Sequence, residues 1–180
     1  MAHKIIDNFL PEAEFKAIQE YFLSPKMPWY YNDHVVYGDG KKDKNQYQFV
    51  HILYLDDLPR GLGIQPVQAI LDKLEILALL RVKVNFQPVR TEHFISGNHF
   101  DNIDFTENDI PYTVGVFYLN DNNGSTHIGK KPIMSKANRM VLFSGDTEHA
   151  GCSATDEPRV VLNFNFINKE TKSLYDGATR

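Results

Sequence analysis

The stretch Gly97-Asn98-His99-Phe100-Asp101-Asn102 is the one around which the rest of the chain is best understood. In an extended strand, residues i and i+2 project from the same face, so His99 and Asp101 can direct an imidazole nitrogen and a carboxylate oxygen to one point. A His-x-Asp pair alone occurs by chance, and a single histidine more often packs or forms hydrogen bonds than binds a metal. The pair therefore predicts a metal site only if the chain supplies a third ligand.

A second stretch supplies that ligand: it begins at His149 and ends at Arg159, which opens a strand-like segment. Two histidines and one carboxylate on one side of a metal ion form the facial triad of non-heme iron(II) sites, which leaves coordination positions open. His99, Asp101 and His149 are therefore the candidate metal ligands. His93 is a weaker candidate because it lacks a carboxylate at i+2.

Composition and charge indicate a single globular domain. The chain has 180 residues, enough for a sizeable core, and 42% of them are hydrophobic, which is typical of a folded chain. The net charge of -4 gives no electrostatic footprint for nucleic acid or for an anionic membrane. No apolar run approaches the roughly 20 residues needed to span a bilayer. We therefore expect a small-molecule, peptide or protein substrate, no nucleic-acid partner and no membrane association.

Cysteine usage and the first residues indicate the compartment. The single cysteine, Cys152, excludes an intramolecular disulfide and fits a reducing environment. The first residues lack the long apolar core of a signal peptide, so a cytoplasmic location is expected. A nucleophilic cysteine needs a paired base and a lowered pKa, so we interpret Cys152 as a small buried thiol.

Two helices are expected in the first half of the chain. Phe15, Ile18 and Phe22 recur at helical spacing after Pro11, and Ser24-Pro25 ends that helix. A second helix is expected from about residue 66 to residue 80. Its predicted apolar face consists of Val67, Ile70, Leu71, Leu74, Leu77 and Ala78.

Strand-like segments make up most of the remaining chain, at 29–37, 47–55, 81–87, 111–120, 125–128, 139–143 and 159–167. Polar turns are expected at 38–45, which includes the basic cluster at 41–44, and at 102–110, beside the metal site. In the last strand, apolar residues alternate with Arg159, Val161, Asn163 and Asn165, so this second face is expected to line a wet cavity. Two helices followed by many short strands favour a two-sheet antiparallel sandwich or jelly roll.

A set of motifs in the second half of the chain resembles the Fe(II)- and 2-oxoglutarate-dependent dioxygenases of the prolyl 4-hydroxylase-like branch. The motifs are His99-x-Asp101, Tyr118-Leu119-Asn120, Asn123-Gly124, Phe143, His149 and Arg159. Residues 81–85, 120–124, 137–139 and 159–165 are similar to the small stand-alone members common in bacteriophages. The resemblance covers about residues 80–167, and the N-terminal part resembles the family only in its helix–strand order.

The resemblance implies a mainly β fold with flanking helices (α+β): a double-stranded β-helix, which is a jelly-roll or cupin-like barrel. It implies one domain over residues 1–180, with a barrel core at about 81–167 and helical and strand support from 1–80. His99, Asp101 and His149 would then be the iron ligands.

The resemblance also implies a cosubstrate site. Arg159 would pair with the distal carboxylate of 2-oxoglutarate, Tyr118 would donate its hydroxyl to the same carboxylate, and Asn163 would lie near the cosubstrate. A planar guanidinium can hold a carboxylate in a bidentate pair, which a lysine cannot. Many relatives place a tyrosine on the strand before the His-x-Asp motif, where this chain has Gln87.

The implied activity converts 2-oxoglutarate and O2 to succinate and CO2 while an unactivated C–H, such as that of a peptidyl proline, is hydroxylated. The implied cofactors are Fe(II), 2-oxoglutarate and O2, with ascorbate as a further reductant, in a bacterial or phage-infected cell. Asp101 argues for hydroxylation or demethylation, because related halogenases replace this carboxylate with a small residue so that halide can bind.

Two other classes of protein are compatible with parts of the pattern. A cupin-like metalloprotein, such as an isomerase, would share the barrel without using 2-oxoglutarate, but cupins more often place additional His or Glu ligands near the first histidine. Arg159 would then have no role. A non-catalytic binding module with a relict site is the third class, and the intact ligands and Arg159 argue against it.

Overall fold

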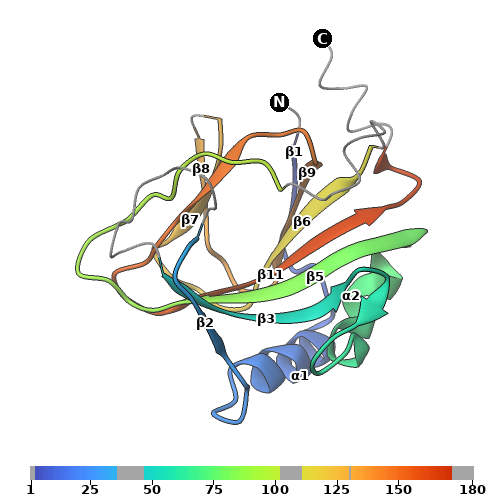
Figure 1. Cartoon of the computed structure of the whole chain (residues 1–180), viewed down its shortest axis with the longest axis horizontal. Helices are drawn as coiled ribbons and strands as arrows, with labels where there is room; N and C mark the ends of the chain where they lie inside the picture. The colour runs from blue at the N-terminus through green and yellow to red at the C-terminus, as the bar shows by residue number, and fades with distance from the viewer. Residues whose placement is uncertain (1–2, 36–46, 102–110, 130, 172–180) are drawn as a thin grey trace.

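The computed structural model describes residues 3–35, 47–101, 111–129 and 131–171. The predicted turn at 38–45, with its basic cluster, and the predicted loop at 102–110 lie outside the described residues. The described strands form two antiparallel sheets, and short helices flank the larger one (Figure 1). This arrangement confirms the predicted mainly β jelly-roll fold with flanking helices.

The larger sheet has eight strands, in the order β1-β9-β6-β11-β5-β3-β2, with β4 paired to β3. The bounds are β1 His3–Ile6, β2 Tyr30–Asn32, β3 Gln48–Leu55, β4 Leu58–Pro59, β5 Ala78–Gln87, β6 Thr113–Tyr118, β9 Arg139–Ser144 and β11 Arg159–Ile167. Strand β11 is central, because it pairs with β5 on one edge and with β6 on the other. The strand that carries Arg159 is therefore held on both sides.

The smaller sheet has three strands in the order β10-β7-β8, with bounds β10 His149–Cys152, β7 Ser125–Ile128 and β8 Lys131–Met134. Isolated bridges join Ile95 to Cys152 and His99 to His149. The segment that leads to Asp101 therefore runs along the free edge of β10, which brings the two predicted histidine ligands together.

The helices cover one face of the larger sheet, and β7 and β8 lie on its other side (Figure 1). They are α1 (Glu12–Phe22), the 3-10 helix η1 (Gln65–Val67) and α2 (Gln68–Lys73). The buried face of α1 is Phe15, Ile18 and Phe22, as predicted from their spacing. These side chains share one core cluster with the apolar residues of β11, which are Val160, Leu162, Phe164 and Phe166. The opposite face of β11 is consequently left for the site.

The second predicted helix is wrong beyond Lys73. Glu75 adopts a left-handed conformation with φ of 49°, which ends the helical path. The N–H of Leu77 then donates to the carbonyl of Ile167 at 2.9 Å, so the chain enters β5 at Ala78. Leu77, which was predicted to lie on the buried apolar face, is 66% exposed, and Ala78 of the same predicted face is exposed as well. Long-range pairing to β11 thus outweighs the local helical spacing.

Several strand predictions differ in extent. The predicted strand at 29–37 is described as a strand only at Tyr30–Asn32, and the short strand β4 lies in a segment for which no strand was predicted. Strands β1, β8 and β10 were not predicted, because each has only four residues, β8 contains a proline and β10 contains a glycine. The other predicted strands are confirmed, with boundaries that shift by a few residues.

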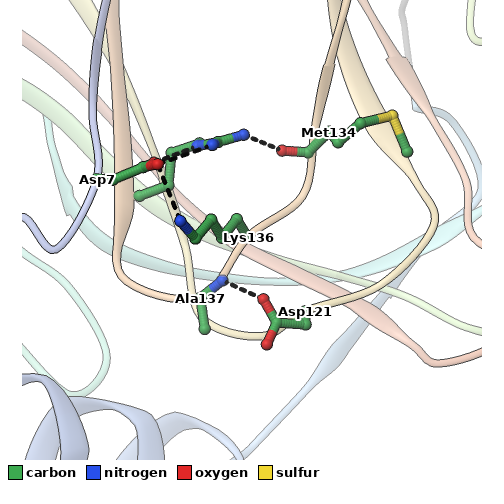
Figure 2. A network of polar contacts seen from close by, with 6 residues as sticks. Asp7, Asp121, Met134, Lys136 and Ala137 are labelled. Carbon is green, nitrogen blue, oxygen red and sulfur yellow. Dashed lines mark hydrogen bonds and ion pairs between the residues drawn. The ribbon is translucent and has the colours of Figure 1, made fainter.

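A polar network fixes the N-terminal segment to the larger sheet (Figure 2). Asp7 accepts from Arg139 Nε at 2.6 Å and from Lys136 Nζ at 2.9 Å, while Arg139 also donates to the carbonyl of Met134. The hydrogen bonds from Arg139 and Lys136 hold the pKa of Asp7 well below its usual range. Nearby, Asp121 accepts from the N–H of Ala137 at 2.8 Å. No helix in the described part of the chain is long and apolar enough to cross a membrane.

Candidate metal centre and adjoining anion site

His99 and His149 are held against each other by their own backbones. The N–H of each residue donates to the carbonyl of the other, at 2.9 and 3.0 Å, and the ring centroids lie 4.4 Å apart. Each Nδ1 lies 3.1 Å from a backbone carbonyl, that of Gly97 for His99 and that of Thr147 for His149. Because a carbonyl only accepts, each Nδ1 carries the hydrogen, and each Nε2 has its lone pair available for a metal ion.

Asp101 completes the predicted triad. One ligand atom from each of His99, Asp101 and His149 lies within 4.8 Å of the others, so the three could hold a metal ion. The sequence prediction placed His99 and Asp101 on a regular strand, but only His99 forms a bridge and Asp101 belongs to no strand. Burial and the neighbouring His149 lower the pKa of His99, which favours the neutral imidazole that a metal requires.

Two residues that the sequence analysis did not assign hold the Asp101 carboxylate. Arg81 Nη2 forms an ion pair with Asp101 Oδ1 at 2.8 Å, and Asn165 Nδ2 donates to Asp101 Oδ2 at 3.3 Å. Arg81 Nε also donates to Asn165 Oδ1 at 2.9 Å, so the three side chains form a closed triangle. Burial by itself would raise the pKa of Asp101, but the positive charge of Arg81 and its other polar neighbours lower it well below its usual range.

Arg159 is a buried cation on the same face of β11. Its Nη2 donates to Thr126 Oγ1 at 2.9 Å, and its Nη1 lies 3.4 Å from Gln87 Oε1. Its Nε has no hydrogen-bond partner, and no carboxylate in the described ranges lies within ion-pair distance of the guanidinium. Among the described residues Arg159 therefore forms no ion pair, which distinguishes it from an ordinary surface arginine. Burying an unpaired charge is costly unless a ligand completes the site.

The guanidinium of Arg159 lies over the aromatic ring of Tyr118. The ring centroid of Tyr118 lies 5.5 Å from the Arg159 guanidinium carbon, and the tyrosine hydroxyl donates to Thr126 Oγ1 at 2.6 Å. Thr126 Oγ1 thus accepts from both residues, which leaves its own hydroxyl hydrogen free for a further acceptor. Tyr118 is fully buried and is not among the residues that line the cavity, so its direct contact with a cosubstrate stays a prediction.

The absence of a side chain at Gly124 leaves the space that the Arg159 side chain occupies. A Cβ added at Gly124 would lie 2.9 Å from Arg159 Cδ and 2.8 Å from the carbonyl oxygen of Cys152. Any side chain at this position would displace one of them. Close packing therefore requires a glycine at this position, a requirement that the Asn123-Gly124 motif alone did not indicate.

One cavity is shared by the triad and by Arg159. Its wall includes His99, Asp101, His149, Arg159, Thr126, Gln87, Lys83 and Asn163. Asn163 lines this cavity, and its position near a cosubstrate stays a prediction. Lys83 was not predicted to belong to the site. Burial, together with nearby Arg81, lowers the pKa of Lys83 to about 8, so its ammonium remains mostly charged at pH 7.

Two other histidines and the single cysteine have structural partners outside the triad. His93 Nδ1 lies 2.8 Å from the carbonyl of Ser153, and His93 is outside the triad. His51 is buried, with Nδ1 on the carbonyl of Pro28 and Nε2 accepting from the N–H of Leu62. Cys152 is buried, and this burial raises the pKa of its thiol, as expected of a structural cysteine.

Solved structures with the same fold exist, although no sequence comparison finds a relative. No family model matches the sequence, and no curated protein matches it. Among solved structures, a Trichoplax adhaerens prolyl hydroxylase in complex with a hypoxia-inducible-factor peptide has a TM-score of 0.62 and 14% identity, covering 95% of this chain and 86% of that chain. The viral collagen prolyl hydroxylase of Paramecium bursaria Chlorella virus-1 has a TM-score of 0.55 and 16% identity, covering 94% and 91%.

A third similar structure is that of an epimerase, whereas the first two are prolyl hydroxylases. SnoN, the non-heme alpha-ketoglutarate-dependent epimerase of nogalamycin biosynthesis, has a TM-score of 0.60 and 14% identity, covering 92% of this chain and 77% of that chain. At such identities the similarity establishes the fold alone. The chain has the jelly-roll fold of these enzymes, with a His-Asp-His group and a buried arginine facing one cavity.

Proposed function

We propose that this chain is an Fe(II)- and 2-oxoglutarate-dependent oxygenase that hydroxylates an unactivated C–H. The observation that carries the proposal is the placement of Arg159: a buried guanidinium with no carboxylate partner in the described structure, facing the cavity that holds the His-Asp-His group. A metal triad alone would fit many proteins. A triad with an unpaired cation beside it fits a ligand that is both a chelator and a carboxylate.

The donor set fits the proposed metal. Two neutral imidazoles and one ionised carboxylate suit iron(II), and a facial arrangement leaves positions for a chelating 2-oxo acid and for dioxygen. His99, Asp101 and His149 would hold the ion, which supplies the activation of dioxygen when it is bound. The Arg81–Asn165 pair keeps the Asp101 carboxylate ionised and oriented, and the carbonyls of Gly97 and Thr147 fix the two imidazole tautomers.

The second half of the cavity fits the proposed cosubstrate. Arg159 would pair with the distal carboxylate of 2-oxoglutarate in a charge-assisted contact, and Thr126 and Tyr118 hold the guanidinium in place. The reaction balances as 2-oxoglutarate plus O2 plus R–H giving succinate, CO2 and R–OH. One oxygen atom enters succinate and the other enters the product.

The cupin-like alternative is less well supported. A metal-dependent isomerase of this fold would leave Arg159 as a buried cation without a counter-charge, and none of the described residues adds a further ligand to the triad. For the primary substrate, the fold similarity to prolyl hydroxylases, one of them in complex with a peptide, makes a prolyl peptide the first candidate to test.

The direct test is conversion of 2-oxoglutarate. The purified chain is supplied with Fe(II), 2-oxoglutarate and air, and succinate is measured with and without prolyl peptides. We expect succinate from the wild type, with at least about a tenfold loss in His99→Ala and no change in the surface control Lys16→Met. Equal succinate formation by the wild type and His99→Ala would contradict the proposal.

A further inference from the structure

Lys83 lies on the floor of the cavity, between its two ends. On β5, Arg81 reaches the Asp101 carboxylate and Gln87 reaches Arg159, and Lys83 stands between these two positions. Across the sheet it lies in register with Asn163 of β11, which lines the same cavity. Lys83 is therefore between the triad and the arginine, where a bound ligand would pass.

The Lys83 ammonium has no ion pair of its own among the described residues. Asp101, the carboxylate that acts on it electrostatically, forms its ion pair with Arg81, and Lys83 has no hydrogen-bond partner in the described ranges. Most lysines avoid this situation by extending into water. The overall charge of the chain is -4, so a concentration of cations in one cavity is a local feature. A retained, uncompensated charge in a cavity indicates a ligand.

The negative charges of Asp101 and 2-oxoglutarate are too few to balance Lys83 as well as the proposed iron and the two arginines. Iron(II) would bring two positive charges, and Arg159, Arg81 and Lys83 one each. Asp101 and 2-oxoglutarate together bring only three negative charges, and the Asp101 charge is shared between the metal and Arg81. With iron and cosubstrate in place the site would therefore keep an excess of positive charge, and Lys83 is the cation without an ion pair, so we expect the primary substrate to bring the counter-charge.

We propose that Lys83 binds an anionic group, a carboxylate or a phosphate, of the primary substrate. The inference rests on the proposed function and defines the substrate class of that same site. The anionic group would be held on the cavity floor beside Asn163, which would place the C–H to be oxidised next to the triad. A substrate without a negative charge would leave the Lys83 ammonium without a counter-charge, which is unfavourable in a cavity shielded from water.

The test measures anion binding and cosubstrate binding separately, without turnover. Protein loaded with Mn(II) is first titrated with 2-oxoglutarate by calorimetry. The saturated complex is then titrated with inorganic phosphate while the paramagnetic broadening of its phosphorus NMR signal is recorded, and the same titration is run with acetate through its proton signal. The variants are Lys83→Met, the charge-conserving Lys83→Arg and the surface control Lys16→Met.

We expect Lys83→Met to weaken phosphate or acetate binding by at least tenfold, Lys83→Arg to restore it to within about threefold, and 2-oxoglutarate affinity to stay within about twofold in all variants. We also expect Lys83→Met to raise the Tm by about 2–4 °C, because it removes an uncompensated charge, and this shows that the variant is folded. Unchanged broadening by both anions in Lys83→Met would overturn the proposal.

A tenfold loss of 2-oxoglutarate affinity in Lys83→Met would also overturn it, because Lys83 would then belong to the cosubstrate. If the wild type itself bound no 2-oxoglutarate in the first titration, the proposed function would fail and this inference with it. That outcome is distinct from either result that overturns the role of Lys83 alone.

Discussion

Arg81 and Asp101 form a 2.8 Å ion pair that joins β5 to the metal triad, with exposed side-chain fractions of only 18% and 15%. Asn165 contacts both partners, so the pair belongs to a closed network across β5 and β11. Burial raises the pKa of the Asp101 carboxyl, but its charged and polar neighbours, Arg81 foremost, lower that pKa by more. The carboxyl is therefore ionised without a metal. Because the carboxylate is charged and oriented in advance, a metal ion meets a site that needs little rearrangement.

Replacement of Arg81 by methionine should weaken metal binding. The strongest of the effects that oppose burial would then be lost, so the pKa of Asp101 would rise and a proton would compete more strongly with the metal for the carboxylate. We expect a loss of about 10–100-fold in Mn(II) affinity at pH 7, measured by calorimetry, and a smaller loss at higher pH. Arg60→Met, at an exposed ion pair, is the control. Metal affinity that is independent of Arg81 would show that the network has no role in binding.

Replacement of Arg159 by lysine should affect the cosubstrate and spare the metal. An ammonium cannot contact Thr126 and also present two parallel donors to a carboxylate. We expect 2-oxoglutarate affinity of the Mn(II)-loaded protein to fall by at least about tenfold, with Mn(II) affinity within twofold of the wild type. The opposite pattern, weak metal binding with normal 2-oxoglutarate affinity, would assign Arg159 to the triad.

Replacement of Gly124 by alanine should act through Arg159. The new Cβ would lie within 2.9 Å of Arg159 Cδ and of the Cys152 carbonyl oxygen, so one of the two has to move. We expect a destabilisation of about 1–3 kcal/mol in urea unfolding, together with weaker 2-oxoglutarate binding. Gly151→Ala is the matched control for the unfolding measurement, because its nearest contact would be an ordinary 3.9 Å. A Gly124→Ala protein with wild-type stability and affinity would refute this packing argument.

Replacement of Asp7 by asparagine should lower stability at neutral pH. The folded-state pKa of Asp7 lies below its unfolded value of 3.8, so its contribution is fully present above that value and is lost as the pH falls through the folded pKa. Asp7 is 36% exposed, so we expect no more than about 1 kcal/mol at pH 7, with the difference shrinking below about pH 4. Urea unfolding of Asp7→Asn at pH 7 and pH 3 checks this, with Glu14→Gln as control. A difference that grows on acidification would contradict it.

The sequence was sufficient for the residues whose chemistry is local. His99 and Asp101 are two positions apart, His149 opens the run that leads to Arg159, and β11 alternates apolar and polar residues, so their grouping could be inferred. The same alternation correctly assigned Val160, Leu162, Phe164 and Phe166 to the core. These features depend on the period of a strand and on the preferences of a metal, and both can be derived without coordinates.

The partners of these residues could not be derived. Arg81 and Asn165 were both placed in predicted strands, but they meet Asp101 only because β5 and β11 pair in one particular register, which joins residues 84 positions apart. The role of Thr126 depends on a contact between the two sheets. The end of α2 was mispredicted for the same reason, since the N–H of Leu77 is taken by Ile167, far along the chain. Register and sheet-to-sheet contact are long-range properties that no local pattern contains.

The central claim is that the metal triad and Arg159 bind one chelating ligand together. The most direct measurement is an anaerobic optical titration of the chain with Fe(II) and then 2-oxoglutarate, recording the visible metal-to-ligand charge-transfer band of the chelate. We predict a saturable band in the wild type, no band in His99→Ala, and a band in Arg159→Lys that needs at least about tenfold more 2-oxoglutarate. A wild-type spectrum without the band at saturating metal and cosubstrate, identical to that of His99→Ala, would contradict the account.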